Sequence, residues 1–178
     1  SIQQSIDVIH PFDFKISDDT QTFDICLPDV GNSWFARGNI LIDSKNNTRF
    51  QLTADILSMA HLGNDLLLIT GEPALIRLST KPAWRKDYVK LPEFFHKIIV
   101  INERVYMITN TMLYEYQSNT RKIIPVDLPT NIGSLLTMFP GNDRLIFLST
   151  KGLWMLDLEH QLVYSKSGKF SAMAVTAN

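Results

Sequence analysis

The sequence predicts an all-β fold assembled from a repeated unit of short antiparallel strands. Residues 142–161 contain two uninterrupted apolar runs that are separated by a polar turn at residues 149–152. A similar pair of apolar runs follows Asn64 and Asn102, so the unit recurs about every 40 residues. No stretch keeps apolar residues at the spacing of three and four that a substantial helix requires. Strands joined by turns are therefore expected throughout.

The loss of apolar and polar alternation in these runs indicates sheets that are covered on both faces. A repeat of about 40 residues with three or four short strands is typical of a β-propeller blade. We expect propeller-like blades of three to four antiparallel strands, about four in all, forming a partial ring or a ring that an oligomer completes. The alternative is a β-sandwich or meander, in which strands also recur regularly, at roughly 8 to 12 residues.

The N-terminal part of the chain fits the repeat less well. Residues 1–53 are expected to form an irregular β segment, with a turn at the polar residues 18–20. Residues 23–29 resemble the last strand of a repeat because they end in Leu27 and Pro28. Residues 38–53 read as a hairpin that turns at residues 45–47.

The repeats are expected at residues 54–93, 94–132 and 133–168, with a partial copy at 169–178, and the whole chain is expected to be one structural unit. In each repeat a short first strand leads to a turn at an asparagine, which is Asn64, Asn102 or Asn142. A second apolar strand follows and ends at Thr70, Thr109 or Ser149. The third strand is apolar and the fourth is more polar. Lysines in the fourth strand of the first repeat and Pro125 in that of the second suit an exposed sheet edge.

Residues 152–158, Gly-Leu-Trp-Met-Leu-Asp-Leu, resemble repeat units of bacterial β-propeller families, in which an apolar strand and a small-residue turn precede a "Gly-Leu-aromatic-x-Leu/Tyr-Asp" strand. Quinoprotein-like propellers and the sensor propellers of two-component regulators share this pattern. The resemblance covers about residues 54–178 and concerns the fold. It implies no cofactor site.

Composition excludes several functional classes. The 17 Lys and Arg residues against 18 Asp and Glu residues give a formal charge of −1, so no global field favours nucleic acid. The apolar runs reach only about seven residues, far fewer than a membrane span needs. Cys26 is the single cysteine, which rules out a disulfide within the chain.

No catalytic residue, metal ligand or cofactor site is predicted. The four histidines have no paired spacing that would indicate a zinc site. The glycines form neither a nucleophile elbow nor a phosphate-binding loop. The acidic residues Asp18, Asp19 and Asp24 lack the loop spacing of a calcium site. We therefore expect a protein that is not an enzyme and that needs no cofactor.

Two stretches combine aromatic and basic side chains and are candidate interaction surfaces. Such combinations can bind another macromolecule, although aromatic residues can equally fill the core and lysines can mark an exposed edge. The candidates are Trp34, Phe35, Arg37, Trp84, Arg85, Lys86, Tyr88, Phe94 and Phe95.

The expected function is a non-enzymatic interaction or sensor domain, a rigid β platform that binds another protein or a small ligand. It would be part of a larger bacterial signalling or regulatory protein, and a periplasmic location is favoured over a cytoplasmic one by analogy. A homo-oligomer or further blades outside this sequence would complete the ring. The alternative is a carbohydrate-binding or enzymatic propeller with its site at the central channel, although the apolar first strands count against chemistry there.

Overall fold

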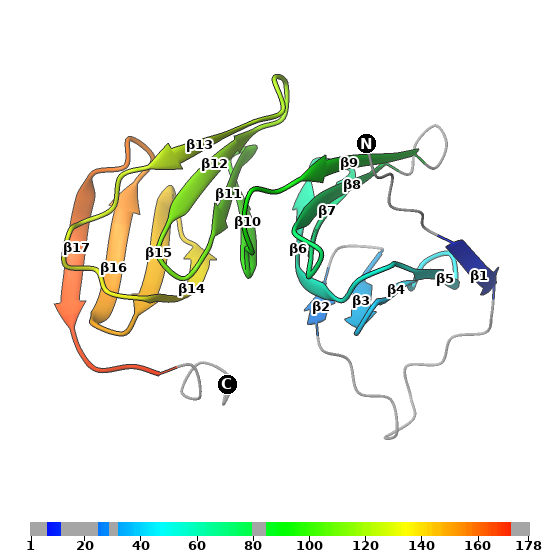
Figure 1. The fold of residues 1–178 in the computed structure, drawn as a ribbon, viewed down its shortest axis with the longest axis horizontal. Coiled ribbons are helices and arrows are strands. Elements are labelled where there is room, and N and C mark those ends of the chain that lie inside the picture. Colours follow the sequence, from blue (N-terminus) through cyan, green and yellow to red (C-terminus); the bar gives the residue numbers. More distant parts are fainter. Residues whose placement is uncertain (1–6, 12–24, 29–31, 80–84, 172–178) are drawn as a thin grey trace. The chain divides into compact units, whose positions relative to one another are not determined.

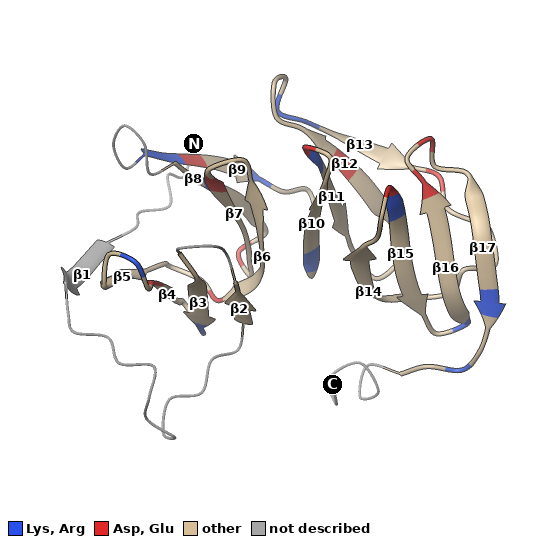
Figure 2. Cartoon of the chain, turned by 180° about the vertical axis from the view of Figure 1, so that it is seen from behind, with Lys and Arg blue, Asp and Glu red and all other residues tan. Residues whose placement is uncertain are grey.

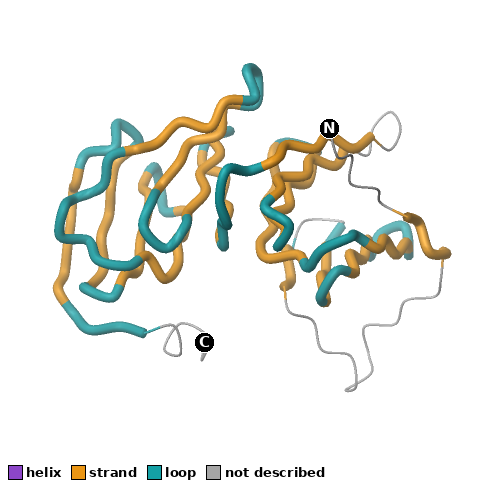
Figure 3. Tube along the Cα trace, in the orientation of Figure 1, coloured by secondary structure: helices purple, strands orange, loops and turns teal. Residues whose placement is uncertain are grey.

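The computed structural model describes residues 7–11, 25–28, 32–79 and 85–171 of the chain (Figure 1). Within these ranges the chain forms 17 strands arranged in four antiparallel sheets. Strands, turns and loops account for every described residue, and no helix occurs among them (Figure 3). The chain divides into two compact units, one comprising residues 1–60 and 66–94 and the other residues 61–65 and 95–178. Each unit contains two of the sheets.

The first sheet of the first unit is a meander with one added strand. Its order is β1-β5-β4-β3-β2. Residues 23–29 were predicted to form the outer strand that ends a repeat. β2 does lie at one edge of this sheet, with β1 at the other, but it starts the meander, so the prediction that it ends a repeat is wrong. The hairpin predicted within residues 38–53 is confirmed by the pairing of β4 with β5. The strands are β1 (Asp7–Pro11), β2 (Ile25–Leu27), β3 (Trp34–Arg37), β4 (Ile40–Asp43) and β5 (Thr48–Gln51).

The second sheet of the first unit is a meander of four strands in chain order, β6-β7-β8-β9. Alternate residues of β7 and β8, with Trp34 and Phe50 of the first sheet, form the core between the two sheets. All apolar residues of β7 and β8 are buried, on both faces of the sheet. In β7 and β8 the continuous apolar runs of the sequence thus correspond to strands covered on both faces. The strands are β6 (Ile56–Leu62), β7 (Asp65–Thr70), β8 (Ala74–Ser79) and β9 (Arg85–Lys90).

The second unit repeats this plan twice. Its sheets have the orders β10-β11-β12-β13 and β14-β15-β16-β17. One core joins them, and it includes the fully buried Tyr106, Met138 and Phe147. The strands are β10 (Lys97–Ile101), β11 (Arg104–Ile108), β12 (Leu113–Gln117), β13 (Lys122–Val126), β14 (Leu135–Pro140), β15 (Arg144–Ser149), β16 (Gly152–Asp157) and β17 (Leu162–Ser167).

Burial falls from the middle of each repeated sheet toward its last strand. Every residue of β17 is exposed, and nearly all residues of β13 and β9 are exposed or only half-buried. Pro125 lies in β13, an edge strand in which a missing N–H donor is tolerated. The polar fourth strand of each repeat was therefore predicted correctly as a sheet edge.

The turns confirm the marker residues of the repeat. Asn64, Asn102 and Asn142 lie in the turns β6–β7, β10–β11 and β14–β15. The hydroxyl residue that ends the second strand organises the next turn. Thr109 Oγ1 accepts hydrogen bonds from the backbone N–H groups of Thr111 and Met112, at 3.2 and 3.0 Å.

Ser149 and Thr70 occupy the same position in their repeats. Ser149 Oγ accepts from Lys151 N at 3.1 Å, and Thr70 Oγ1 donates to Glu72 O at 3.0 Å. All three hydroxyl residues are buried. They recur because each turn offers backbone groups that need a partner inside the protein.

Candidate functional site

The predicted interaction residues lie in different environments. Trp34 is 3% exposed and belongs to the core of the first unit, and Phe35 is also buried. Arg37 and Arg85 are exposed at the ends of β3 and β9. Trp84 lies outside the described residues. The aromatic pair in β3 therefore helps to build the core, as the sequence already allowed.

The remaining candidates are divided in the same way. Lys86 and Tyr88 are half-buried in β9, and Tyr88 packs against the core of the first unit. Phe94 is 67% exposed. Phe95 is buried in the second unit, where its ring meets Tyr114 edge to face with centroids 5.2 Å apart. An interaction through Arg37, Arg85, Lys86 and Phe94 stays a prediction.

One face of the β14–β17 sheet is apolar and partly exposed. Side chains alternate along a strand, so Ile146 and Leu148 point away from the core that Leu145 and Phe147 enter. The strand register places Met155 beside Ile146 and Leu153 beside Leu148. Tyr164, which is 46% exposed, lies beside Met155. We call these five residues the open face.

The preceding sheet shows what the same positions do when they are covered. Counting back from the hydroxyl residue that ends the second strand, Tyr106 and Ile108 correspond to Ile146 and Leu148. Both are fully buried in the core against the next sheet. Leu113, which corresponds to Leu153, is fully buried there too. The open face is thus a packing face of this repeat that remains accessible.

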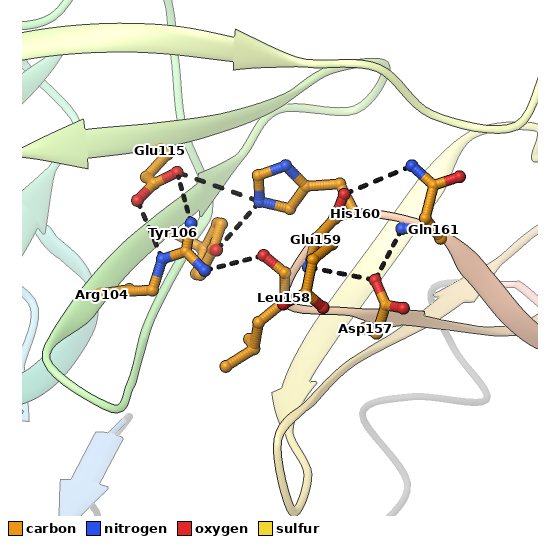
Figure 4. Close-up of polar contacts among 8 residues, drawn as sticks. All are labelled: Arg104, Tyr106, Glu115, Asp157, Leu158, Glu159, His160 and Gln161. Atoms are coloured by element: carbon orange, nitrogen blue, oxygen red, sulfur yellow. Dashed lines mark hydrogen bonds and ion pairs between the residues drawn. The ribbon is translucent and has the colours of Figure 1, made fainter.

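A polar cluster links the two sheets of the second unit (Figure 4). Arg104 of β11 pairs with Glu115 of β12, with Nε 3.2 Å from Oε1, and its Nη1 donates to Leu158 O at 2.7 Å. Leu158 begins the β16–β17 turn of the other sheet. In that turn His160 Nε2 lies 3.0 Å from the Tyr106 hydroxyl.

The cluster has the properties of a structural link. Burial, reinforced by the charge of Glu115, raises the pKa of Tyr106 to about 12. Its hydroxyl therefore stays protonated at neutral pH and is unsuited to act as a base. The guanidinium of Arg104 is committed to Glu115 and Leu158. We assign the cluster to holding the β16–β17 turn against the preceding sheet.

A pocket of about 900 Å³ opens at the other end of the same pair of sheets. One wall is the connection from β13 to β14, with Thr130, Asn131 and Gly133. The lining also includes Trp154 of β16 and the residues at the end of β17. Lys151 and Lys169 are among the lining residues, and Figure 2 shows basic residues at the end of β17 and on the loop after it. The complete lining is Thr130, Asn131, Gly133, Lys151, Trp154, Ser167, Gly168 and Lys169.

The partial ring expected from the sequence implied an uncovered face on the last repeat, but the sequence did not identify the residues of the open face as interaction candidates. Sequence reasoning missed this pocket. The pocket depends on strand pairing that brings Lys151 beside Gly168, whose N–H donates to Lys151 O at 3.0 Å. Nothing in the local sequence indicates that contact.

Two further findings limit the chemistry of the described residues. No group of three or more His, Cys, Asp and Glu side chains in the described ranges could hold a metal ion. In the same part of the chain, no helix is long and apolar enough to cross a membrane.

Comparison with known proteins identifies the fold. No protein-family model matches the chain, and no curated protein matches it. Among solved structures, the extracellular domain of a putative hybrid two-component system from B. thetaiotaomicron superposes with a TM-score of 0.65 at 15% identity, over 88% of this chain and 24% of that one. The β-propeller domain of Swd1 from Myceliophteria thermophila gives 0.60 at 14% identity, over 77% and 52%.

YCF48, solved bound to a D1 peptide, superposes with a TM-score of 0.55 at 15% identity, over 82% of this chain and 54% of that one. The chain therefore spans between about a quarter and about half the length of these structures. At such low identities the likeness concerns the fold alone. Together with the repeated antiparallel meanders, it shows that the sheets of this chain are β-propeller blades.

Proposed function

We propose that this chain is a non-enzymatic interaction domain, a rigid β platform that binds another protein through the open face. It belongs to a larger bacterial signalling or regulatory protein whose sensory region lies outside the cytoplasmic membrane. The likeness to the extracellular domain of a putative hybrid two-component system supports this assignment at the level of fold. The open face is the observation that carries the proposal.

The repeat itself indicates what binds there. Tyr106, Ile108 and Leu113 are fully buried because a second four-stranded sheet packs on them. Ile146, Leu148 and Leu153 occupy the same positions on the next sheet and remain partly exposed. Exposed apolar surface of this kind marks interaction sites in soluble proteins. The occupant is accordingly another sheet of the same type, with an apolar face of its own.

In a solution of the isolated chain, only a second copy can supply such a sheet. Sedimentation velocity over roughly 5 to 500 μM should therefore show reversible self-association. Ile146→Glu places a charge in the middle of the open face and should abolish the association. Ile124→Glu is the matched control, because Ile124 is 38% exposed in β13 and lies outside the open face.

The control variant should associate like the wild type. A wild-type chain that stays monomeric across this range would contradict the proposal. So would association that Ile146→Glu leaves intact.

A further inference from the structure

The pocket beside Trp154 is chemically distinct from the open face. Trp154 turns into the core side of its sheet, whereas Leu153 and Met155 on either side of it belong to the open face. A ligand in this pocket would contact the core side of the sheet and not the open face.

The walls of the pocket are held in place by the backbone. Thr150 N donates to Ser134 O at 2.9 Å, and Ser134 N donates to Thr150 Oγ1 at 3.1 Å. This pair joins the β13–β14 connection to the β15–β16 turn. The bond from Gly168 N to Lys151 O joins the end of β17 to the same turn. Three segments that are distant in the sequence thus form one fixed rim.

Trp154 has a fixed orientation in this rim. Its Nε1 donates to Ser149 Oγ at 3.0 Å, and the residue packs partly against the core. The indole therefore offers a flat apolar surface to the pocket without losing its own hydrogen bond. A preformed apolar wall of this kind reduces the cost of ordering a ligand.

The charged groups of the pocket have one sign. Lys151 and Lys169 line it, and no Asp or Glu does. Both lysines are exposed, and neither forms an ion pair with any described residue of the chain. Asn131, Thr130 and Ser167 add uncharged hydrogen-bonding groups to the lining. Two ammonium groups beside an apolar plane are suited to an anion with a flat apolar body.

We propose that this pocket binds a small organic carboxylate, whose anionic group lies between Lys151 and Lys169 and whose apolar body rests on Trp154. The hydroxyl and carboxamide groups of the lining position the ligand. Its binding leaves the open face free, so the chain can hold the ligand and a protein partner together.

Fluorine NMR of the chain labelled with 5-fluorotryptophan tests this proposal. The chain has three tryptophans, and Trp154→Phe assigns the resonance of Trp154 by its loss. The probe is benzoate, and its uncharged counterpart is benzamide. Benzoate should shift the Trp154 resonance with a dissociation constant on the order of 1 mM, as expected for a fragment of this size. Benzamide should bind at least about fivefold more weakly.

Lysine variants locate the anionic group. Lys151→Gln and Lys169→Gln should each weaken benzoate binding about threefold, and the double variant about tenfold, since exposed ion pairs contribute modestly. Lys122→Gln, in an exposed position of β13, is the matched control and should bind like the wild type. Raising the salt concentration should weaken binding in the wild type more than in the double variant.

Three outcomes would overturn the proposal. The first is a Trp154 resonance that benzoate leaves unmoved at about ten times the expected dissociation constant. The second is equal binding of benzoate by the wild type and the double lysine variant. The third is inorganic phosphate that binds as tightly as benzoate, because the pocket would then recognise charge without the apolar body.

Discussion

Replacing Gly152 by alanine should destabilise the second unit strongly. Gly152 pairs with Ser167 of β17 and has a φ of 153°, which a residue with a side chain rarely adopts. An added Cβ would lie 2.2 Å from the carbonyl oxygen of Lys166. Because carbon and oxygen atoms need a separation of about 3.3 Å, β17 would have to move away by about 1 Å.

The expected cost follows from the groups that this movement disturbs. The strained backbone costs about 1–2 kcal/mol. Loss of the hydrogen bond from Gly168 N to Lys151 O costs about 1 kcal/mol more. We expect Gly152→Ala to lower the free energy of unfolding by about 2–3 kcal/mol. Urea denaturation followed by circular dichroism measures the loss, and amide hydrogen exchange should locate it in β16 and β17.

Gly63→Ala is a matched control for this experiment. Gly63 has a φ of +59°, and an added Cβ would meet nothing within 4 Å. Replacing Gly63 by alanine should lower the free energy of unfolding only through the strain of a left-handed backbone, by about 1 kcal/mol. If both variants unfold at the same urea concentration, the contact between Gly152 and Lys166 does not set the position of β17, and the reasoning is refuted.

Further predictions concern the core and the titrating groups of the second unit. Phe147→Ala should cost about 3–5 kcal/mol in urea denaturation, because Phe147 is fully buried, whereas Ile124→Ala at the exposed edge should cost under about 1 kcal/mol. Desolvation lowers the pKa of His96 below 6.5, so the folded protein resists protonation of this side chain. The free energy of unfolding should therefore fall as the pH is lowered from 6.5 through the pKa of folded His96. The urea midpoint of His96→Gln should therefore fall less than that of the wild type between about pH 7.5 and about pH 5. Because the pKa of Tyr106 is raised from 10.0 to about 12, the free energy of unfolding should decline between these two pH values. Tyr106→Phe should flatten this decline. The variant should also be less stable near neutral pH, because it loses the contact with His160.

The fold was predictable from the sequence because its signal repeats. Continuous apolar runs such as residues 66–69 and 105–108 recur at one spacing, and they are fully buried because both faces of their sheets are covered. The first sheet was less predictable, since its strands span only three to five residues. With so few residues per strand, the Leu27-Pro28 pair was the main signal, and it led to the wrong prediction that residues 23–29 end a repeat.

The candidate sites were harder to predict, because they depend on which neighbour lies beside each face. The same aromatic residue type is buried at Phe95 and exposed at Phe94, although the two are adjacent in the chain. Lys151 and Lys169 are joined into one pocket by the register of β16 with β17. Hydrophobic pattern specifies the strands, whereas such contacts arise from the pairing of strands and the packing of sheets.

The hydroxyl of Ser149 couples two properties that a protein usually varies separately. In the other repeats the equivalent hydroxyl serves a turn alone, but Ser149 Oγ also accepts the indole N–H of Trp154. A substitution that spares the turn yet removes this acceptor would release the indole ring. Ligand preference at the pocket and stability of the hairpin are therefore tied to a single atom, and selection acting on one of them constrains the other.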